Sequence, residues 1–198
     1  PGAFIPAAES LGLVSDIDRL VIAKTVDYQC RLQRACRDYT LSINLSGKEI
    51  GDEQLLQALR DRVRRTGIDP GKLVFEITET AAITDLDKAV RFVDELRGIG
   101  FRFSLDDFGV GFTSFIYLRE MAVDYLKIDG VFVRRLHESR ADQGIVQAIT
   151  SVARGFRIKT IAEFVEHPET LERLKDLHVD YAQGFLIGKP APEVHCGG

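Results

Sequence analysis

Apolar segments with strand character alternate with helical segments along the whole chain, and this alternation limits the possible folds most. Six segments show the alternating or continuously apolar pattern of a strand, and between them apolar residues recur at helical spacing. Such an order implies parallel strands joined by right-handed crossovers. The expected strands span residues 40–44, 73–77, 101–106, 124–128, 158–163 and 179–183. The sequence therefore predicts an α/β fold, either a doubly wound sheet or a TIM-like (β/α)8-type barrel.

The helical segments carry their own start and stop signals. The first begins near Phe4, breaks near Gly12 and restarts at Ser15, where Ser15 and Asp18 have the spacing of a capping box. Later helices are expected to stop at glycines, and Pro168 is well placed in the first turn of the last one.

Polar residues near the carboxyl ends of the six strands favour the barrel. A doubly wound sheet gathers its ligand groups at one switch point, whereas a barrel aims a side chain from every strand at one centre. Six strands are fewer than eight, and 198 residues are fewer than the roughly 250 of a complete barrel. We therefore expect an incomplete barrel that lacks its first two strands. The strand-end residues are Asn44, Glu76, Asp106, Lys127, Glu163 and Gln183.

Two consecutive carboxylates, Asp106 and Asp107, stand at the end of the third expected strand and precede Gly109 and Gly111. Neighbouring side chains in a strand point to opposite faces, so the two can converge only where the strand ends. Carboxylates held close repel each other by several kcal/mol unless a cation or a proton lies between them. For an isolated pair, two solvated loop aspartates are the commoner arrangement.

The strand-end residues that offer only oxygen donors indicate a hard metal ion. Asn44, Glu76, Asp106 and Asp107 suit Mg²⁺ or Mn²⁺ better than Zn²⁺ or copper. One aspartate can bridge two ions about 4 Å apart, an arrangement used for in-line attack on a phosphodiester.

Two further strand-end residues offer acid–base chemistry. Lys127 could orient the attacking water or neutralise a phosphate oxygen. Glu163 could bind the second ion through water or accept the proton of the water.

Each residue also has a structural explanation. Asn44 could bond local backbone groups, Glu76 and Glu79 could be surface charges, and Lys127 could be a solvated rim residue. His137 and His178 are expected to be exposed residues rather than ligands, and Cys30 a small apolar residue of a helix.

The composition limits partners and compartment. The net charge is −4, and the 26 lysines and arginines form no basic run, which argues against a nucleic-acid polymer as partner. A phosphate ligand would then need metal ions. The three cysteines, Cys30, Cys36 and Cys196, show no metal-ligand spacing and predict a reduced, cytoplasmic location. No membrane-length apolar run is present. Because the chain opens at Pro1 without methionine, we expect a piece of a longer protein, which could itself be membrane-anchored.

Seven ordered runs that cover the chain resemble the EAL domain family, the bacterial cyclic di-GMP phosphodiesterases. They are Pro-Gly-Ala-Phe-Ile-Pro (1–6), Ser-Ile-Asn-Leu-Ser (42–46), Phe-Glu-Ile-Thr-Glu-Thr (75–80), Leu-Asp-Asp-Phe-Gly (105–109), Leu-Lys-Ile-Asp (126–129), Ala-Glu-Phe-Val-Glu (162–166) and Asp-Tyr-Ala-Gln-Gly (180–184). On this resemblance, residues 1–198 are one EAL domain without its first two strands.

The resemblance implies a role for each candidate residue. Asn44, Glu76 and Asp106 would bind the first metal ion, and Asp106 and Asp107 the second. Lys127 and Glu163 would orient the water and act as base or second-metal residue. Glu79 would anchor the loop 107–115, while Glu166 and Gln183 would complete the substrate pocket. Phe164 stands where the family more often has glycine, so it would either stack on a guanine base or crowd it.

The resemblance also implies a reaction and partners. Two ions, Mg²⁺ or Mn²⁺, would assist attack by water on one phosphodiester of cyclic di-GMP, giving linear pGpG. A homodimer and upstream sensory or diguanylate-cyclase-like domains are expected. The glutamate that names the family lies upstream of the run at Pro1. The alternative is a degenerate EAL domain that acts as a cyclic di-GMP receptor or protein-interaction module without cleavage.

Overall fold

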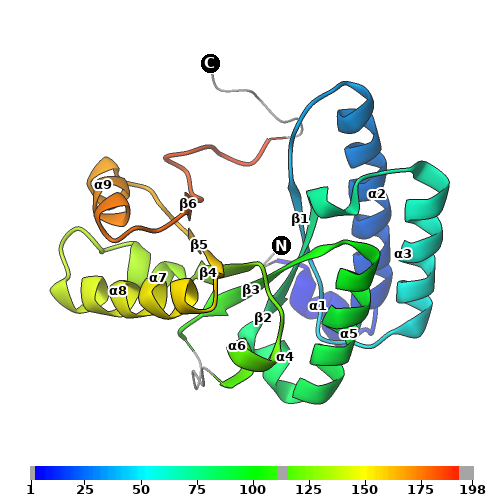
Figure 1. Ribbon diagram of the computed structural model, residues 1–198, viewed down its shortest axis with the longest axis horizontal. Helices are drawn as coiled ribbons and strands as arrows, with labels where there is room; N and C mark the ends of the chain where they lie inside the picture. The colour runs from blue at the N-terminus through cyan, green and yellow to red at the C-terminus, as the bar shows by residue number, and fades with distance from the viewer. Residues whose placement is uncertain (1–2, 111–115, 192–198) are drawn as a thin grey trace. The chain divides into compact units, whose positions relative to one another are not determined.

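The computed structural model describes residues 3–110 and 116–191 (Figure 1). A 3-10 turn, Pro70–Lys72, precedes the second strand. The strands are β1 (Leu41–Asn44), β2 (Leu73–Thr78), β3 (Arg102–Phe108), β4 (Tyr125–Ile128), β5 (Lys159–Ala162) and β6 (Tyr181–Ala182). The helices are α1 (Ile5–Ser10), α2 (Val14–Arg34), α3 (Glu53–Thr66), α4 (Glu79–Thr84), α5 (Leu86–Ile99), α6 (Ile116–Glu120), α7 (Gly130–Val133), α8 (Arg140–Gly155) and α9 (Pro168–Asp176).

The six strands follow one another in chain order, β1-β2-β3-β4-β5-β6, in one sheet. The β1–β2, β2–β3, β4–β5 and β5–β6 pairs are parallel. Their register places Asn44 beside Glu76, and Lys127 beside Ile161. Parallel neighbours in chain order, separated by helices, confirm the predicted α/β class.

The described residues form two compact units. The first comprises those of Pro1–Asp106 and Ser114–Asp124, and the second those of Asp107–Thr113 and Tyr125–Gly198. No helix among the described residues has the length and apolar character that would let it span a membrane.

The core of the first unit forms where aromatic side chains of β2 and β3 meet. The Phe75 ring lies 5.2 Å from that of Phe101, nearly perpendicular to it, and 5.9 Å from that of Phe103. All three are fully buried, as are Phe92 and Leu96 of α5. Aromatic pairs at such distances contribute about 0.5–1.5 kcal/mol beyond the burial of their area. The apolar face of α5, read from the sequence at helical spacing, therefore packs as expected.

In each unit an aspartate accepts a hydrogen bond from the backbone near the start of a strand. In the first, Asp124 accepts hydrogen bonds from the Phe103 backbone N–H at 2.9 Å and from Arg97 at 2.6 Å. In the second, Asp180 accepts from the Thr160 backbone N–H at 2.9 Å and from Lys159 at 2.6 Å. Each carboxylate thus holds the backbone at the amino end of the strand from which it accepts, β3 in the first unit and β5 in the second.

The expected break and restart of the first helical segment is confirmed, because Gly12 has a φ of +73° between α1 and α2. The expected capping box is wrong. Leu13 occupies the N-cap of α2 without a side-chain hydrogen bond, and Ser15 lies inside the helix. Asp18 is buried and accepts a hydrogen bond from the Ser46 backbone N–H at 3.0 Å. The Asp18 carboxylate, which the local spacing predicted would cap the helix, is instead bonded to a residue distant in the sequence.

Candidate active site

In the first unit the oxygen donors lie at the carboxyl ends of adjacent strands. Asn44 ends β1 directly beside Glu76 of β2, and the Leu45 backbone N–H donates to the Glu76 carbonyl at 2.8 Å. Asp106 pairs in register with Thr78, two residues further along than Glu76. Glu76 and Asp106 are 5% and 8% exposed, whereas Asn44 is exposed. Burial excludes the reading of Glu76 as an ordinary surface charge.

The third strand does not end at Asp106 as predicted but continues to Phe108. What separates the two aspartates from regular strand geometry is the backbone of Asp107, whose φ is +55°. This left-handed conformation is uncommon outside glycine, although aspartate adopts it more readily than most residues. It interrupts the alternation of the strand, so consecutive carboxylates need not point to opposite faces.

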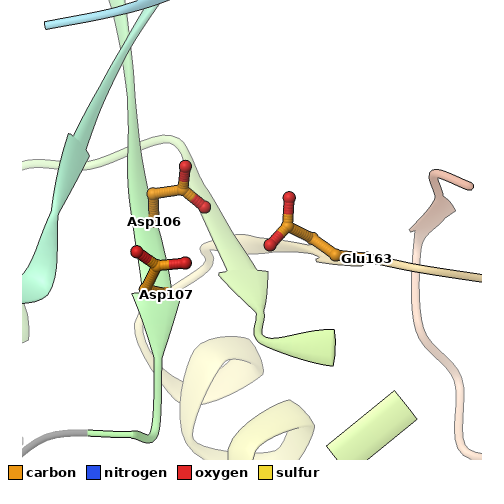
Figure 2. Close-up of side chains that lie close together, drawn as sticks. All are labelled: Asp106, Asp107 and Glu163. Carbon is orange, nitrogen blue, oxygen red and sulfur yellow. The ribbon is translucent and has the colours of Figure 1, made fainter. Parts of the chain in front are cut away.

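Asp106, Asp107 and Glu163 form an acidic cluster. One carboxylate oxygen from each lies within 4.8 Å of the other two, as Figure 2 shows for the three side chains. Among the described residues, Glu76 is not part of this cluster. Three carboxylates so close repel one another unless a cation or a proton lies among them. Their hard oxygen atoms match the donors that Mg²⁺ and Mn²⁺ prefer.

Lys127 and Glu163 form a buried ion pair in the second unit. The Lys127 Nζ lies 2.8 Å from Glu163 Oε1, and the two side chains are 4% and 11% exposed. Lys127 comes from β4, and Glu163 directly follows β5, where its backbone N–H donates to the Ile128 carbonyl at 3.2 Å. Lys127 is therefore not a solvated rim residue. Its ammonium group fixes the Glu163 carboxylate and offsets one negative charge.

Phe164 has a φ of +54°, a conformation that glycine adopts freely and phenylalanine rarely does. The residue remains 45% exposed. The Arg134 guanidinium stacks over the ring at 4.0 Å from the centroid, and Arg134 Nη1 lies 3.7 Å from Glu166 Oε1. A Cβ atom on Gly130 would lie 2.3 Å from the ring, so the ring packs directly against the glycine backbone. Phe164 thus contacts both Arg134 and Gly130.

The segment that carries Gln183 is fixed by backbone contacts with Val165. The Gln183 backbone accepts a hydrogen bond from the Val165 N–H at 3.0 Å, and the Val165 carbonyl accepts from the Leu186 N–H at 3.0 Å. A Cβ on Gly184 would lie 2.3 Å from both the backbone nitrogen and the carbonyl oxygen of Val165. The Gln183 side chain is exposed.

Glu79 is the first residue of α4 and is only 2% exposed. Its Oε1 accepts a hydrogen bond from the Tyr117 hydroxyl at 2.6 Å. Burial and the bond to the Glu79 carboxylate raise the pKa of Tyr117 well above its ordinary value. Tyr117 belongs to α6, which follows the loop 107–115, and residues 111–115 of that loop lie outside the described residues.

Sequence reasoning missed several residues of these surroundings. Tyr117 and Arg134 lie on α6 and just after α7, and neither of these short helices carries a pattern that predicts a partner. Ser104 is fully buried, and its hydroxyl makes no hydrogen bond among the described residues. Its position two residues before Asp106 in an alternating strand placed it on the same face, which was a usable signal.

Of the two histidines expected to be exposed, His178 is exposed, whereas His137 is not. The His137 Nδ1 lies 2.9 Å from the Thr170 hydroxyl, in a half-buried position, and His178 is exposed. Cys30 is a buried free cysteine on α2, as expected, and Cys36 is free and exposed. Cys196 lies outside the described residues.

Comparison with curated proteins finds close relatives. The chain is 42% identical over 192 residues to the cyclic di-GMP phosphodiesterase PdeB of Shewanella oneidensis, covering 97% of this chain and 22% of the relative. It is 34% identical to the cyclic di-GMP phosphodiesterase PdeF of Escherichia coli, covering 97% of this chain and 26% of the relative. The chain thus spans about a quarter of the length of these relatives.

Solved structures share the fold. A structure described as the PaMucR phosphodiesterase in complex with c-di-GMP matches 97% of this chain and 78% of its own, with a TM-score of 0.87 and 34% identity. The EAL domain of Xanthomonas citri FimX in complex with c-di-GMP matches 100% of this chain and 78% of its own, with a TM-score of 0.95 and 27% identity. The six-stranded arrangement is therefore that of a TIM-like α/β fold, as predicted.

The family model for the EAL domain matches residues 1–190. Together with the relatives and the shared fold, this match shows that the chain belongs to the EAL domain family.

Proposed function

We propose that this chain hydrolyses cyclic di-GMP to linear pGpG as the catalytic domain of a longer phosphodiesterase. The observation that carries the proposal is the acidic cluster of Asp106, Asp107 and Glu163 together with the Lys127–Glu163 ion pair. Relatives that match 97% of this chain are named cyclic di-GMP phosphodiesterases. Water would form a bond to phosphorus, the bond from phosphorus to the ribose 3′ oxygen would break, and that oxygen would leave as a hydroxyl after taking a proton.

The donor set fits divalent metal ions. Asn44, Glu76, Asp106 and Asp107 offer oxygen atoms alone, and the described cluster gathers more negative charge than Lys127 offsets. We propose that these four residues hold two ions, Mg²⁺ or Mn²⁺, with Asp106 shared between them. When bound, such ions polarise a phosphodiester and lower the pKa of an attacking water.

The ion pair supplies the acid–base chemistry. Glu163 is held by Lys127 at 2.8 Å and would accept the proton of the attacking water. Lys127, with three donor hydrogens, would orient that water or stabilise charge on a phosphate oxygen. Because both side chains are buried, their interactions are stronger than they would be in water.

The remaining candidates would bind the substrate. Glu166, which pairs with Arg134, would offer carboxylate oxygens to a guanine edge. The exposed Gln183 would offer its side-chain amide. The exposed Phe164 ring offers an apolar face for a base. Glu79, tied to Tyr117, would anchor the loop 107–115.

We further propose that residues 1–198 act as one EAL domain, which two strands preceding Pro1 would complete. The relatives are about four times longer than the matched segment, which supports additional domains in the whole protein. A homodimer and a cytoplasmic location of this domain complete the proposal. The free thiols of Cys30 and Cys36 suit a reducing compartment.

The test is product formation by the full-length protein that contains this chain. Cyclic di-GMP is incubated with Mg²⁺, Mn²⁺, Ca²⁺ or EDTA, and pGpG is separated by chromatography. We expect turnover with Mg²⁺ or Mn²⁺ and substrate binding with little turnover in Ca²⁺, whose longer and looser coordination misplaces the water. Asp106→Asn should reduce turnover to background.

Asp94→Asn is the matched control, because it makes the same chemical change on the exposed face of α5. Turnover by Asp106→Asn at the wild-type rate would contradict the proposal. Tight nucleotide binding that ignores EDTA, with no product under any metal ion, would instead identify a receptor.

A further inference from the structure

We propose that the second unit contains a separate binding pocket for a small phosphate-bearing molecule. The pocket is a cavity of about 290 Å³. Lys159 is the first residue of β5, whereas Glu163 follows its last residue, so the pocket lies at the opposite end of this strand from the candidate active site. The residues that line it are Thr150, Arg154, Arg157, Ile158, Lys159, Thr160, His178 and Asp180.

The lining carries an excess of positive charge. Arg154, Arg157 and Lys159 are cations and Asp180 is the single carboxylate, which leaves two positive charges with His178 neutral. The Asp180 carboxylate is also fully engaged. Its Oδ1 accepts from Lys159 at 2.6 Å, and its Oδ2 accepts from the Thr160 backbone N–H at 2.9 Å and the Thr160 hydroxyl at 3.1 Å. It therefore has little capacity left to neutralise the arginines.

Neither Arg154 nor Arg157 makes a side-chain hydrogen bond or an ion pair with the described residues, although both line the same cavity. A guanidinium presents five donor hydrogens in a planar fork that matches phosphate oxygens two at a time. Both arginines are exposed, so these donor hydrogens are accessible to a ligand from solvent. A phosphate monoester, with a charge of about −1.5 to −2 at neutral pH, would match the excess charge.

The end of α8 opposes an anion only weakly. A helix carboxyl end carries roughly half a negative charge, which is smaller than the excess of two positive charges. Two of its last carbonyl groups are also occupied. Those of Ala153 and Arg154 accept hydrogen bonds from the backbone N–H groups of Ile158 at 2.9 Å and Arg157 at 3.0 Å.

The backbone supports the same inference. Arg157 and His178 have φ values of +61° and +58°, which non-glycine residues adopt at a cost of about 1–2 kcal/mol. Glycine would remove that cost at either position. The chain instead has Arg157 and His178 there, whose donor groups line the cavity.

The volume limits the ligand. Pockets for small molecules commonly span about 300–1,000 Å³, so this cavity suits a ligand at the small end of that range. The shared chemistry is a phosphate group, which either free inorganic phosphate or a small phosphomonoester would bring.

The test is titration calorimetry of the full-length protein that contains this chain with inorganic phosphate and with ribose 5-phosphate, in chloride at physiological ionic strength. We expect saturable binding of at least one probe. Arg154→Ala/Arg157→Gly should weaken it by about tenfold or more, because charge-assisted bonds are lost. Arg140→Ala, which removes the same charge from the exposed start of α8, should leave the affinity unchanged.

Tighter binding of ribose 5-phosphate than of phosphate identifies a phosphomonoester as the ligand, and equal binding identifies free phosphate. No saturable binding of either probe, or equal affinity in the double variant, overturns the proposal. Circular dichroism verifies that each variant folds. If the double variant does not fold, Arg157→Gly alone decides, because glycine suits the left-handed backbone there. None of these outcomes depends on hydrolysis of cyclic di-GMP.

Discussion

At the scale of single residues, Asp107 and Phe164 show how the candidate active site departs from regular backbone geometry. Both have positive φ, at +55° and +54°. The sequence predicted that Asp106 and Asp107 would converge, but it placed the cause at a strand end. The strand in fact continues, and the local conformation of Asp107 interrupts its alternation. Such a conformation in a non-glycine residue depends on its tertiary surroundings, so no sequence pattern could have predicted it.

The strain at Phe164 can be measured by comparing two variants that both remove the ring. Alanine keeps a Cβ at φ +54°, whereas glycine does not. We therefore expect Phe164→Gly to have a free energy of unfolding about 1 kcal/mol higher than Phe164→Ala, measured by urea denaturation. At Ile145, in the middle of α8, the order should reverse by a similar amount. Equal stability of the two Phe164 variants would show that the backbone is not strained there.

At the scale of elements, the starts of the strands depend on carboxylates that the sequence analysis did not single out. Asp124 and Asp180 accept hydrogen bonds from the backbone N–H groups of Phe103 and Thr160, near the starts of β3 and β5. The strands themselves were predicted within a few residues, because apolar patterns report burial. The short helices α4 and α7 were missed, because four to six residues are too few to show a period.

The Asp180 contacts predict a pH dependence of stability. Burial alone would raise the pKa of Asp180, but its bonds to Lys159 and Thr160 outweigh burial and hold the pKa below its ordinary value of 3.8. A lowered pKa in the folded state means stabilisation that is present above pH 3.8 and is lost as the pH falls further. Asp180→Asn should cost about 1–2 kcal/mol near neutral pH. In urea denaturation, its difference from the wild type should shrink below pH 3.8, whereas a constant difference would contradict the assignment.

The turn after β6 predicts an intolerant glycine. A Cβ on Gly184 would lie 2.3 Å from two backbone atoms of Val165, which cannot move away as a flexible side chain could. Gly184→Ala should therefore lower the free energy of unfolding by about 2 kcal/mol or more. Gly188→Ala is the control, since nothing lies within 4 Å of its added Cβ, and its effect should stay within about 0.5 kcal/mol. Similar melting temperatures for the two variants would refute the close approach.

At the scale of the whole molecule, the fold class and the family could be predicted from the sequence. Parallel order follows from the alternation of strands and helices, and seven ordered runs cover the chain. The division into two compact units could not be predicted, because the boundary falls inside β3, between Asp106 and Asp107, where no linker composition marks it. The metal ions, the ligand roles and the base role remain predictions.

Metal binding should raise the free energy of unfolding of the whole chain and therefore its melting temperature. An ion that binds only the folded state at a hundred times its dissociation constant adds about 2.7 kcal/mol. For a chain of 198 residues this corresponds to a rise in melting temperature of roughly 5–10 °C. We expect Mg²⁺ or Mn²⁺ to produce such a rise in thermal melts and EDTA to reverse it. Asp106→Asn should abolish the rise and Asp94→Asn should keep it, so an equal rise in both variants would place the ion elsewhere.

The contact between Phe164 and Gly130 also restricts the order in which this sequence can change. A Cβ at position 130 would lie 2.3 Å from the Phe164 ring, close to where the ring joins the backbone. As long as residue 164 is phenylalanine, Gly130 cannot be replaced by a residue with a side chain. Once Phe164 is replaced by glycine, position 130 becomes free to accept other residues, and each such acceptance blocks the return of phenylalanine. The pair is therefore epistatic, because position 164 must lose its ring before position 130 can gain a side chain.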